Sequence, residues 1–434
     1  MNDQTPTRIV IASLAAGAMI ALALVLVVFP GATESVVTGS MLVGFGCGWG
    51  LLARLSTRRG GRAQRWAAVL ATAMTVTGVA LVVLAPGAAA MRTLTWVWPP
   101  AVLSLAVWSF VQVRRSLTGR GRWLVVPVLA VLAASSVGAT FASVSEARVG
   151  RDFPAPGTTY DIDGHRMHLF CQGEGGPTVV LFNGLGEIST SWAHITDRVR
   201  TTTRVCAFDR AGQAWSEDAA APEDGLQAAA DLHALLAAAG EQGPFVLAGH
   251  SIGGPYALVY ASRFPEQVAG LVLLDSSSPE QMTAIPAYPG QYAVMRRGLA
   301  MLPTLGRIGL ARMLATGADL PGDAADETVA MTGTARALRN GRDEIAMVPT
   351  LFEESQALTS IGDRPLAVLT ASESLEGDGW QEAQDELGRL STNHLARTVR
   401  SSHDGMVSDA DVAAESADAI TAVVTSVRTG RPVR

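Results

Sequence analysis

The sequence predicts two structural classes in one chain of 434 residues: an α-helical membrane bundle over 1–150, followed by an α/β domain over 151–434. Two observations predict this division. The first part is built almost entirely from Ala, Val, Leu, Gly and Trp, in long uncharged runs. The second part alternates strand-like with helix-like stretches, which is typical of a mostly parallel sheet covered by helices on both faces.

Five apolar runs in the first part are each close to the roughly 20 residues that a helix needs to cross a bilayer. None of the runs contains Asp, Glu, Lys, Arg or His. One such run can be a buried core helix, but five in series, joined by short polar loops, favour a multi-pass membrane region. The expected spans are about 9–29, 36–53, 66–85, 96–113 and 123–145.

The arginines between these runs predict an orientation. The loops after the second and fourth expected spans hold nine arginines, whereas the loops after the first and third hold only Arg92. Because positively charged loops stay on the cytoplasmic side, we expect a cytoplasmic N-terminus and an α/β domain outside the cytoplasm, at the cell membrane. The nine residues are Arg54, Arg58, Arg59, Arg62, Arg65, Arg114, Arg115, Arg120 and Arg122.

The expected spans have the composition of an anchor or an assembly unit. No ionisable side chain lies at membrane depth, where a transporter or proton relay normally needs one. The second span reads "GFGCGWG", which places Gly44 and Gly48 four residues apart, and Gly46 and Gly50 likewise. This small-xxx-small spacing permits close helix packing.

Charge and motif content exclude several partners. The net charge is +9 over 1–150 and −15 over 151–434, which together give the −6 of the whole chain. An acidic domain without a basic stripe argues against nucleic acid as a partner. The sequence contains no nucleotide-binding motif and no metal-ligand pattern, so we expect neither a cofactor nor a metal. It leaves the oligomeric state open.

Four motifs of the α/β domain resemble one family. "GHSIG", between a strand-like run and a helix-like run, resembles the nucleophile elbow of the α/β-hydrolase fold. "FDRAGQAWS" and "GLVLLD" resemble the segment after the family's fourth strand and its sixth strand, and "SSHDGM" resembles its histidine loop. The resemblance covers about 159–426. It implies a mostly parallel eight-stranded sheet with a helical cap, and a serine hydrolase of the esterase or lipase kind.

The resemblance also implies a catalytic triad. Ser251 lies in the elbow, where flanking glycines keep Cβ atoms out of a crowded turn. His403 follows the last expected strand, where the family places its base. Asp275, which ends the sixth strand, is the favoured acid, and Glu373, which follows the seventh strand, is the alternative. Ser374 stands about where the family usually has an aspartate.

The oxyanion hole and the cap follow from the same resemblance. The N–H groups of Ile252, at the start of the elbow helix, and Leu185, after the third strand, are the expected donors. Asn183 replaces the histidine usual in this loop and is expected to hold it in place. A cap is expected at about 279–360, and its Met-rich apolar sequence indicates either an apolar substrate group or the cap's own core.

Two cysteines fall on strands that are neighbours in the sheet of this family. Cys171 ends the second expected strand and Cys206 begins the fourth, which runs antiparallel to it. Their Cα atoms should therefore lie close enough for a disulfide. The expected location outside the cytoplasm favours such a bridge, with two buried thiols as the alternative.

The function expected from these observations is a membrane-anchored serine hydrolase that cleaves an ester-type substrate, including lipids or other apolar acyl esters, through an acyl-enzyme intermediate. A serine nucleophile disfavours haloalkane dehalogenases and epoxide hydrolases, which share the fold but attack with aspartate. The alternatives are a peptidase or thioesterase of the same fold, or a non-catalytic membrane sensor or assembly protein that kept the fold.

Overall fold

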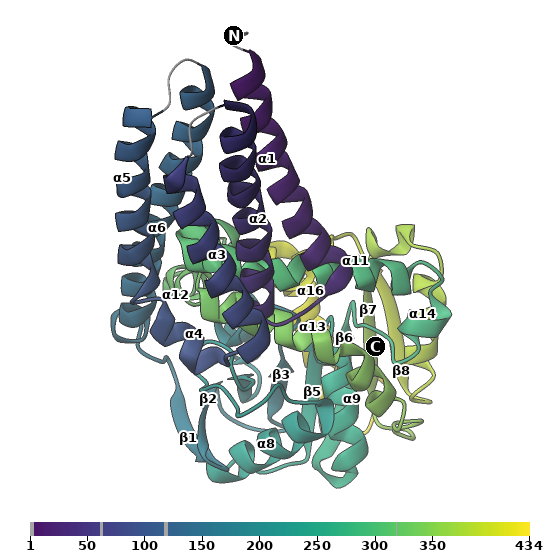
Figure 1. Ribbon diagram of the computed structural model, residues 1–434. Coiled ribbons are helices and arrows are strands. Elements are labelled where there is room, and N and C mark those ends of the chain that lie inside the picture. The colour runs from purple at the N-terminus through teal and green to yellow at the C-terminus, as the bar shows by residue number, and fades with distance from the viewer. Residues whose placement is uncertain (1–3, 61–63, 117–119, 318) are drawn as a thin grey trace. The chain divides into compact units, whose positions relative to one another are not determined.

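The computed structural model describes all residues except 1–3, 61–63, 117–119 and 318 (Figure 1). Arg62, one of the loop arginines, lies outside the described residues. The chain forms two compact units, which we call the helical unit and the sheet unit. The helical unit comprises Met1–Arg148 and Val294–Ala311, and the sheet unit comprises Val149–Ala293 and Arg312–Arg434.

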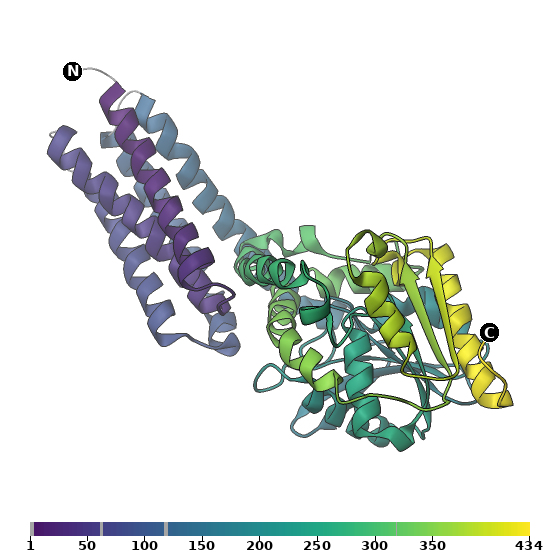
Figure 2. The same cartoon turned by 90° about the vertical axis from the view of Figure 1, so that its right-hand side faces the viewer.

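Long helices run side by side through the helical unit (Figure 2). Among the described residues, four helices are long and apolar enough to cross a membrane, or five if α4 and α5, which are bent by 44°, form one span. The expected span at 96–113 lies mostly in α5. The helices are α1 (Gln4–Ala23, continued by η1, Leu24–Val28), α2 (Glu34–Gly60), α3 (Arg65–Leu84), α4 (Ala88–Leu94), α5 (Trp98–Ser116) and α6 (Arg120–Asp152).

Glycines let α2 pack closely against both of its neighbours, as their spacing predicts. A Cβ atom at Gly44 would lie 2.4 Å from the Ala21 nitrogen of α1, and one at Gly46 would lie 2.9 Å from the Thr75 nitrogen of α3. The two glycine pairs therefore serve different neighbours, because residues two apart point to different sides of a helix.

The segment Val294–Ala311 packs within the helical unit although it lies inside the expected cap insertion. It consists of most of α11 (Tyr288–Leu305) and the helical turn η4 (Gly306–Leu310). The Arg307 guanidinium donates to the Glu34 carboxylate at 2.7 Å, and both side chains are more than nine-tenths buried. Ala300 and Met301 pack against Val25 and Val37.

The sheet unit is built on one eight-stranded sheet, which confirms the predicted number of strands. Its order is β1-β2-β4-β3-β5-β6-β7-β8; β1 and β2 are antiparallel to their neighbours and the other pairs are parallel. The strands are β1 (Thr158–Ile162), β2 (His165–Gln172), β3 (Val179–Phe182), β4 (Val205–Asp209), β5 (Phe245–His250), β6 (Val268–Leu274), β7 (Leu366–Ala371) and β8 (His394–Val399).

Helices cover both faces of this sheet (Figure 1). α7, α15 and α16 pack on one face, and α8, α9 and α13 on the other. Because six strands are parallel, their carboxyl ends meet along one edge, where α/β proteins place their sites. The helices are α7 (Ala193–Val199), α8 (Gly225–Ala238), α9 (Gly253–Arg263), α10 (Gln281–Ala284), α12 (Asp323–Thr332), α13 (Ala335–Ser355), α14 (Trp380–Gly388), α15 (Gly405–Ser408) and α16 (Ala410–Thr429).

The predicted disulfide is present between β2 and β4. Cys171 and Cys206 face each other in the antiparallel register of these strands, with their Cα atoms 4.0 Å apart, and their sulfur atoms are bonded. Cys47, in α2, is a free cysteine. The bridge therefore joins the antiparallel edge of the sheet to its parallel part.

Candidate active site

The elbow after β5 has the strained geometry expected from its sequence. Ser251 has a φ of 55°, a conformation that costs a residue other than glycine roughly 1–3 kcal/mol unless its surroundings hold it. The backbone supplies that support, because Ser251 N–H donates to the Leu274 carbonyl at 3.3 Å and Ser277 N–H donates to the Ser251 carbonyl at 3.0 Å. A Cβ atom at Gly253 would lie 2.1 Å from the Phe182 oxygen, so the turn requires glycine there.

His403 lies beside this elbow and pairs with Asp275. The His403 Nδ1 atom is 2.6 Å from Asp275 Oδ2. When Nδ1–H donates to the carboxylate, Nε2 is the ring nitrogen left to accept a proton. The rings of His403 and His250, the residue before Ser251, lie with their centroids 4.6 Å apart. The three predicted triad positions therefore lie at the same edge of the sheet.

Asp275 is fully buried and its carboxylate is saturated with donors. Besides His403, it accepts from the Ser374 hydroxyl at 2.6 Å, the Trp380 indole N–H at 3.1 Å and the Ala371 N–H at 3.1 Å. Burial alone would raise the pKa of Asp275, but the hydrogen bonds from His403 and Ser374 outweigh it and hold the pKa below its usual value. The site therefore keeps an ionised carboxylate against the imidazole.

The structure separates the two candidate acids. Glu373 is exposed, and among the described residues its side chain makes no hydrogen bond or ion pair with His403. Ser374, at the position where an aspartate is usual, instead donates to Asp275 from the adjacent strand end. The carboxylate that contacts His403 thus comes from the end of β6, and the end of β7 contributes hydrogen-bond donors to it.

The two expected oxyanion donors are available. Within the described parts of the chain, neither Leu185 N–H nor Ile252 N–H donates to another residue. Ile252 precedes the first turn of α9, so its N–H belongs to the free donors at a helix start. Both groups could therefore serve a developing negative charge.

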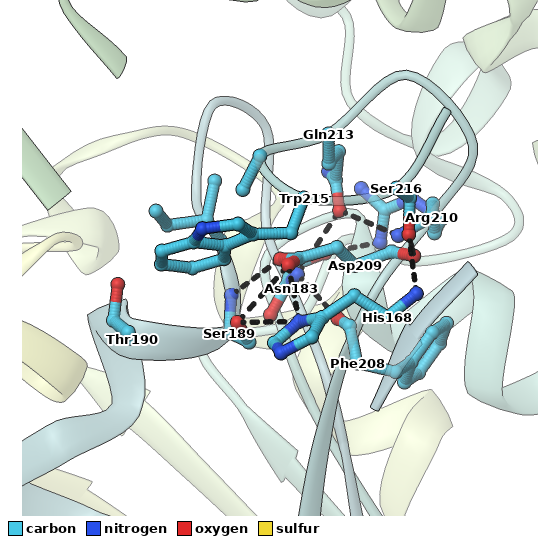
Figure 3. A network of polar contacts seen from close by, with 12 residues as sticks. His168, Asn183, Ser189, Thr190, Phe208, Asp209, Arg210, Gln213, Trp215 and Ser216 are labelled. Carbon is cyan, nitrogen blue, oxygen red and sulfur yellow. Dashed lines mark hydrogen bonds and ion pairs between the residues drawn. The ribbon is translucent and has the colours of Figure 1, made fainter. Parts of the chain in front are cut away.

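Asn183 anchors the loop after β3, as expected. Its amide nitrogen donates to the Phe208 carbonyl at 2.8 Å, and its amide oxygen accepts from the Trp192 indole at 2.9 Å. The Arg210 guanidinium donates to the Asn183 carbonyl at 2.7 Å. Figure 3 shows this amide among the polar side chains that follow β4. The loop holding Leu185 is thus fixed from both the side chain and the backbone of Asn183.

A second buried network supports the same loop. His168 Nδ1 lies 2.7 Å from Asp209 Oδ2, and both side chains are fully buried (Figure 3). The other oxygen of Asp209 accepts from Ser189 N–H at 2.7 Å. Both oxygens of the buried Asp209 carboxylate therefore have hydrogen-bond partners, as buried polar groups require. This carboxylate ties β2 and β4 to the segment that follows Leu185.

Sequence reasoning missed one charged residue at the site, Glu187. Its carboxylate lies 2.5 Å from His250 Nδ1 and accepts from Gly184 N–H at 2.5 Å. A Cβ atom at Gly184 would lie 3.1 Å from both the Glu187 carboxylate and Ser251 Cβ, so these residues meet around one glycine. "GLGE" gave no signal of this role, because a glutamate in a glycine-rich loop is usually solvated.

Two groups of described residues have the composition of metal ligands. The first contains Cys171 and Cys206, whose sulfur atoms are already bonded to each other. In the second, His165 Nε2 lies 3.3 Å from Asp231 Oδ2 and 3.9 Å from Glu223 Oε1, and burial together with the Asp231 carboxylate raises the pKa of Glu223 to about 8. Neither group contains Ser251, His403 or Asp275.

Comparison with known proteins assigns the fold. Residues 177–303 match the protein family described as alpha/beta hydrolase fold. The sheet unit has the α/β-hydrolase fold. Superposition on the crystal structure of DBJA gives a TM-score of 0.51 at 17% sequence identity. The match covers 63% of this chain and 100% of the DBJA chain.

Curated relatives match parts of this chain. Epoxide hydrolase 4 of Mus musculus is 32% identical over 133 residues, which are 30% of this chain and 36% of that protein. An uncharacterised Schizosaccharomyces pombe protein is 27% identical over 215 residues, covering 48% of this chain and 39% of that protein. The chain thus spans less than half the length of these relatives.

Proposed function

We propose that the protein is a membrane-anchored serine hydrolase that cleaves carboxylic esters through an acyl-enzyme intermediate. The observation that carries the proposal is the hydrogen bond between His403 Nδ1 and the buried Asp275 carboxylate, beside a strained turn that presents Ser251. This arrangement supplies a base in a fixed tautomer and a nucleophile held clear of its own helix. The similarity to hydrolases of the same fold supports it.

The proposed reaction has two halves. In the first, Ser251 Oγ attacks the ester carbonyl carbon while His403 Nε2 takes its proton, and the Leu185 and Ile252 N–H groups bind the oxyanion. The C–O bond to the alcohol then breaks as His403 returns the proton to the leaving oxygen. In the second half, water attacks the acyl-enzyme with the same base, which releases the acid and restores Ser251.

The nucleophile separates this proposal from other activities on the fold. Enzymes of the epoxide hydrolase kind attack with an aspartate, and here the elbow carries Ser251. A serine with a histidine base suits acyl transfer. Esters are the substrates that we favour within that class, and peptides and thioesters are the alternatives for the experiment to separate.

The cap gives limited guidance on the substrate. Part of its apolar character is already used inside the protein, since Ala300 and Met301 pack against Val25 and Val37 within the helical unit. Those side chains therefore do not indicate an apolar substrate. A small-molecule or lipid ester remains the proposed class, and the chain length of its acyl group is what the experiment measures.

We place the sheet unit outside the cytoplasm, on the outer side of a cell membrane that the long apolar helices cross. The placement requires five crossings, with the bent pair of α4 and α5 counted as one span, and a cytoplasmic N-terminus, which the arginine-rich loops favour. Four crossings would return the chain to the cytoplasmic side. The Cys171–Cys206 bridge supports the same placement, because disulfides persist in oxidising compartments.

The proposal is tested by hydrolysis of p-nitrophenyl esters of graded acyl length with the full-length protein in detergent. We expect turnover by the wild type with a preference for one length range, and loss of turnover in Ser251→Ala. A non-catalytic sensor would hydrolyse none of the series. A peptidase would also cleave a matched peptide series, which an esterase would leave intact.

A further inference from the structure

We propose that Glu187 and His250 form a buried positioning pair that ties the oxyanion loop after β3 to the loop that carries His403. This inference rests on the proposed hydrolase function and deepens it. His250 directly precedes the nucleophile, and Glu187 directly follows the Gly184–Gly186 stretch that supplies the expected oxyanion donor. The pair therefore sits between the groups that a serine hydrolase has to align.

Both ring nitrogens of His250 face acceptors. Nδ1 lies 2.5 Å from the Glu187 carboxylate, and Nε2 lies 3.0 Å from the His403 carbonyl oxygen. A carbonyl oxygen can only accept, so Nε2 has to carry a hydrogen. The second oxygen of Glu187 accepts from Gly184 N–H, which favours the ionised carboxylate. The arrangement is therefore satisfied by an imidazolium paired with a carboxylate.

The charged neighbours are consistent with that ionisation. His403 and Asp275 face His250, and Arg210 interacts with Glu187 from the end of β4. Burial alone would lower the pKa of His250. The charge and hydrogen bond of the Glu187 carboxylate raise the pKa by more than burial lowers it, so the net shift is upward. Burial likewise raises the pKa of Glu187, and the contacts with His250 and Gly184 N–H bring it below its usual value.

Two consequences follow for the chemistry. The pair fixes the backbone of His403 on one side and of Gly184 on the other, so the base and the oxyanion loop move together. The pair is also neutral overall and adjoins the His403 ring, whose centroid is 4.6 Å from that of His250. Removing one member alone would leave a net charge beside the base, and that charge would shift its pKa.

The experiment measures kcat/KM for p-nitrophenyl butyrate against pH, with the full-length wild type, Glu187→Gln, His250→Gln and the double variant. His250→Gln leaves the Glu187 carboxylate uncompensated, so the acid limb of the profile should move up by roughly one pH unit. Glu187→Gln leaves a cation instead, so the limb should move down. The double variant removes both charges and should return the limb to the wild-type position with a reduced kcat.

His394→Gln is the matched control, because His394 bonds a backbone carbonyl from the opposite end of β8; it should keep the wild-type profile. If the His250→Gln protein does not fold, His250→Asn keeps a donor toward Glu187 and replaces it in the test. Single variants with unshifted limbs, or with shifts of the same sign, would overturn the pair. Failure of the wild type to react with a fluorophosphonate would instead contradict the proposed function.

Discussion

The carboxyl edge of the sheet and the interior of the helical unit are both closely packed, but different interactions hold them. At the sheet edge, two residues other than glycine, Ser251 and Asp275, have positive φ values of 55° and 40°, and polar contacts hold both. In the helical unit, Gly44 and Gly46 bring α2 against two other helices. Polar contacts thus hold strained backbone at the sheet edge, where chemistry is proposed, and close apolar packing holds α2 against its neighbours in the helical unit.

This difference predicts that substitutions at the sheet edge change rates and that substitutions in the helical unit change stability. The largest expected effect is that of Ser251→Ala, which should lower kcat by roughly 10⁴–10⁶-fold while the protein stays folded. Steady-state hydrolysis of a p-nitrophenyl ester measures the rate, and an unchanged thermal unfolding curve is the control. Retention of more than a tenth of the activity would remove Ser251 from the mechanism.

The second prediction compares the two carboxylates that could serve as the triad acid, at the ends of β6 and β7. Asp275→Asn should lower kcat by roughly 10²–10⁴-fold, because the amide favours the wrong tautomer of His403. Glu373→Gln is the matched control and should leave kcat nearly unchanged, since that exposed carboxylate does not contact His403. The reverse pattern would place the acid after β7.

The third prediction concerns the contribution of the Cys171–Cys206 disulfide to the stability of the sheet unit. Replacing Cys171 and Cys206 together by alanine opens a loop with a sequence separation of 35, which should cost about 3–4 kcal/mol of unfolding free energy. Activity of the folded fraction should be unchanged, because the pair lies away from the elbow, between β2 and β4. Denaturant unfolding with and without reductant measures the loss, and a shift below 1 kcal/mol would contradict it.

The smallest effect tests the glycine contacts of the helical unit. Gly44→Ala puts a Cβ atom 2.4 Å from the Ala21 backbone nitrogen, so α1 and α2 have to separate, at a cost of roughly 1–3 kcal/mol. Gly50→Ala is the control, because its Cβ would meet only Ala71 at 3.7 Å. Thermal unfolding in detergent should separate the two variants, while ester hydrolysis stays at wild-type rates in both. Equal stability would mean that the Gly44 contact is not required.

Much of this organisation could be predicted from the sequence, because it depends on local patterns. Hydrophobic run lengths marked the long helices, glycine spacing marked the packing face of α2, and the glycines around Ser251 marked the turn. The pairing of Cys171 with Cys206 followed from the order of strands in a known fold. Each of these features is encoded within a few residues or in a regular topology.

The remaining features depend on contacts between distant segments. The sequence favours Asp275 but keeps Glu373 as an alternative, because the donors from Ser374 and Trp380 that hold the carboxylate facing His403 are contacts between distant segments. Glu187 gave no signal, since its partner His250 is 63 residues away. The packing of Val294–Ala311 in the helical unit likewise depends on a pair formed by Arg307 with Glu34.

The most direct test of the central claim is to label the full-length protein with an alkyl fluorophosphonate and locate the adduct by peptide mass spectrometry. A cooperative thermal unfolding curve of the same preparation shows that the labelled protein is folded. We predict a single adduct on Ser251, formed rapidly in the wild type and slowly in Asp275→Asn. Folded protein that carries no adduct, or carries it on another serine, would contradict the assignment of a serine hydrolase centred on Ser251.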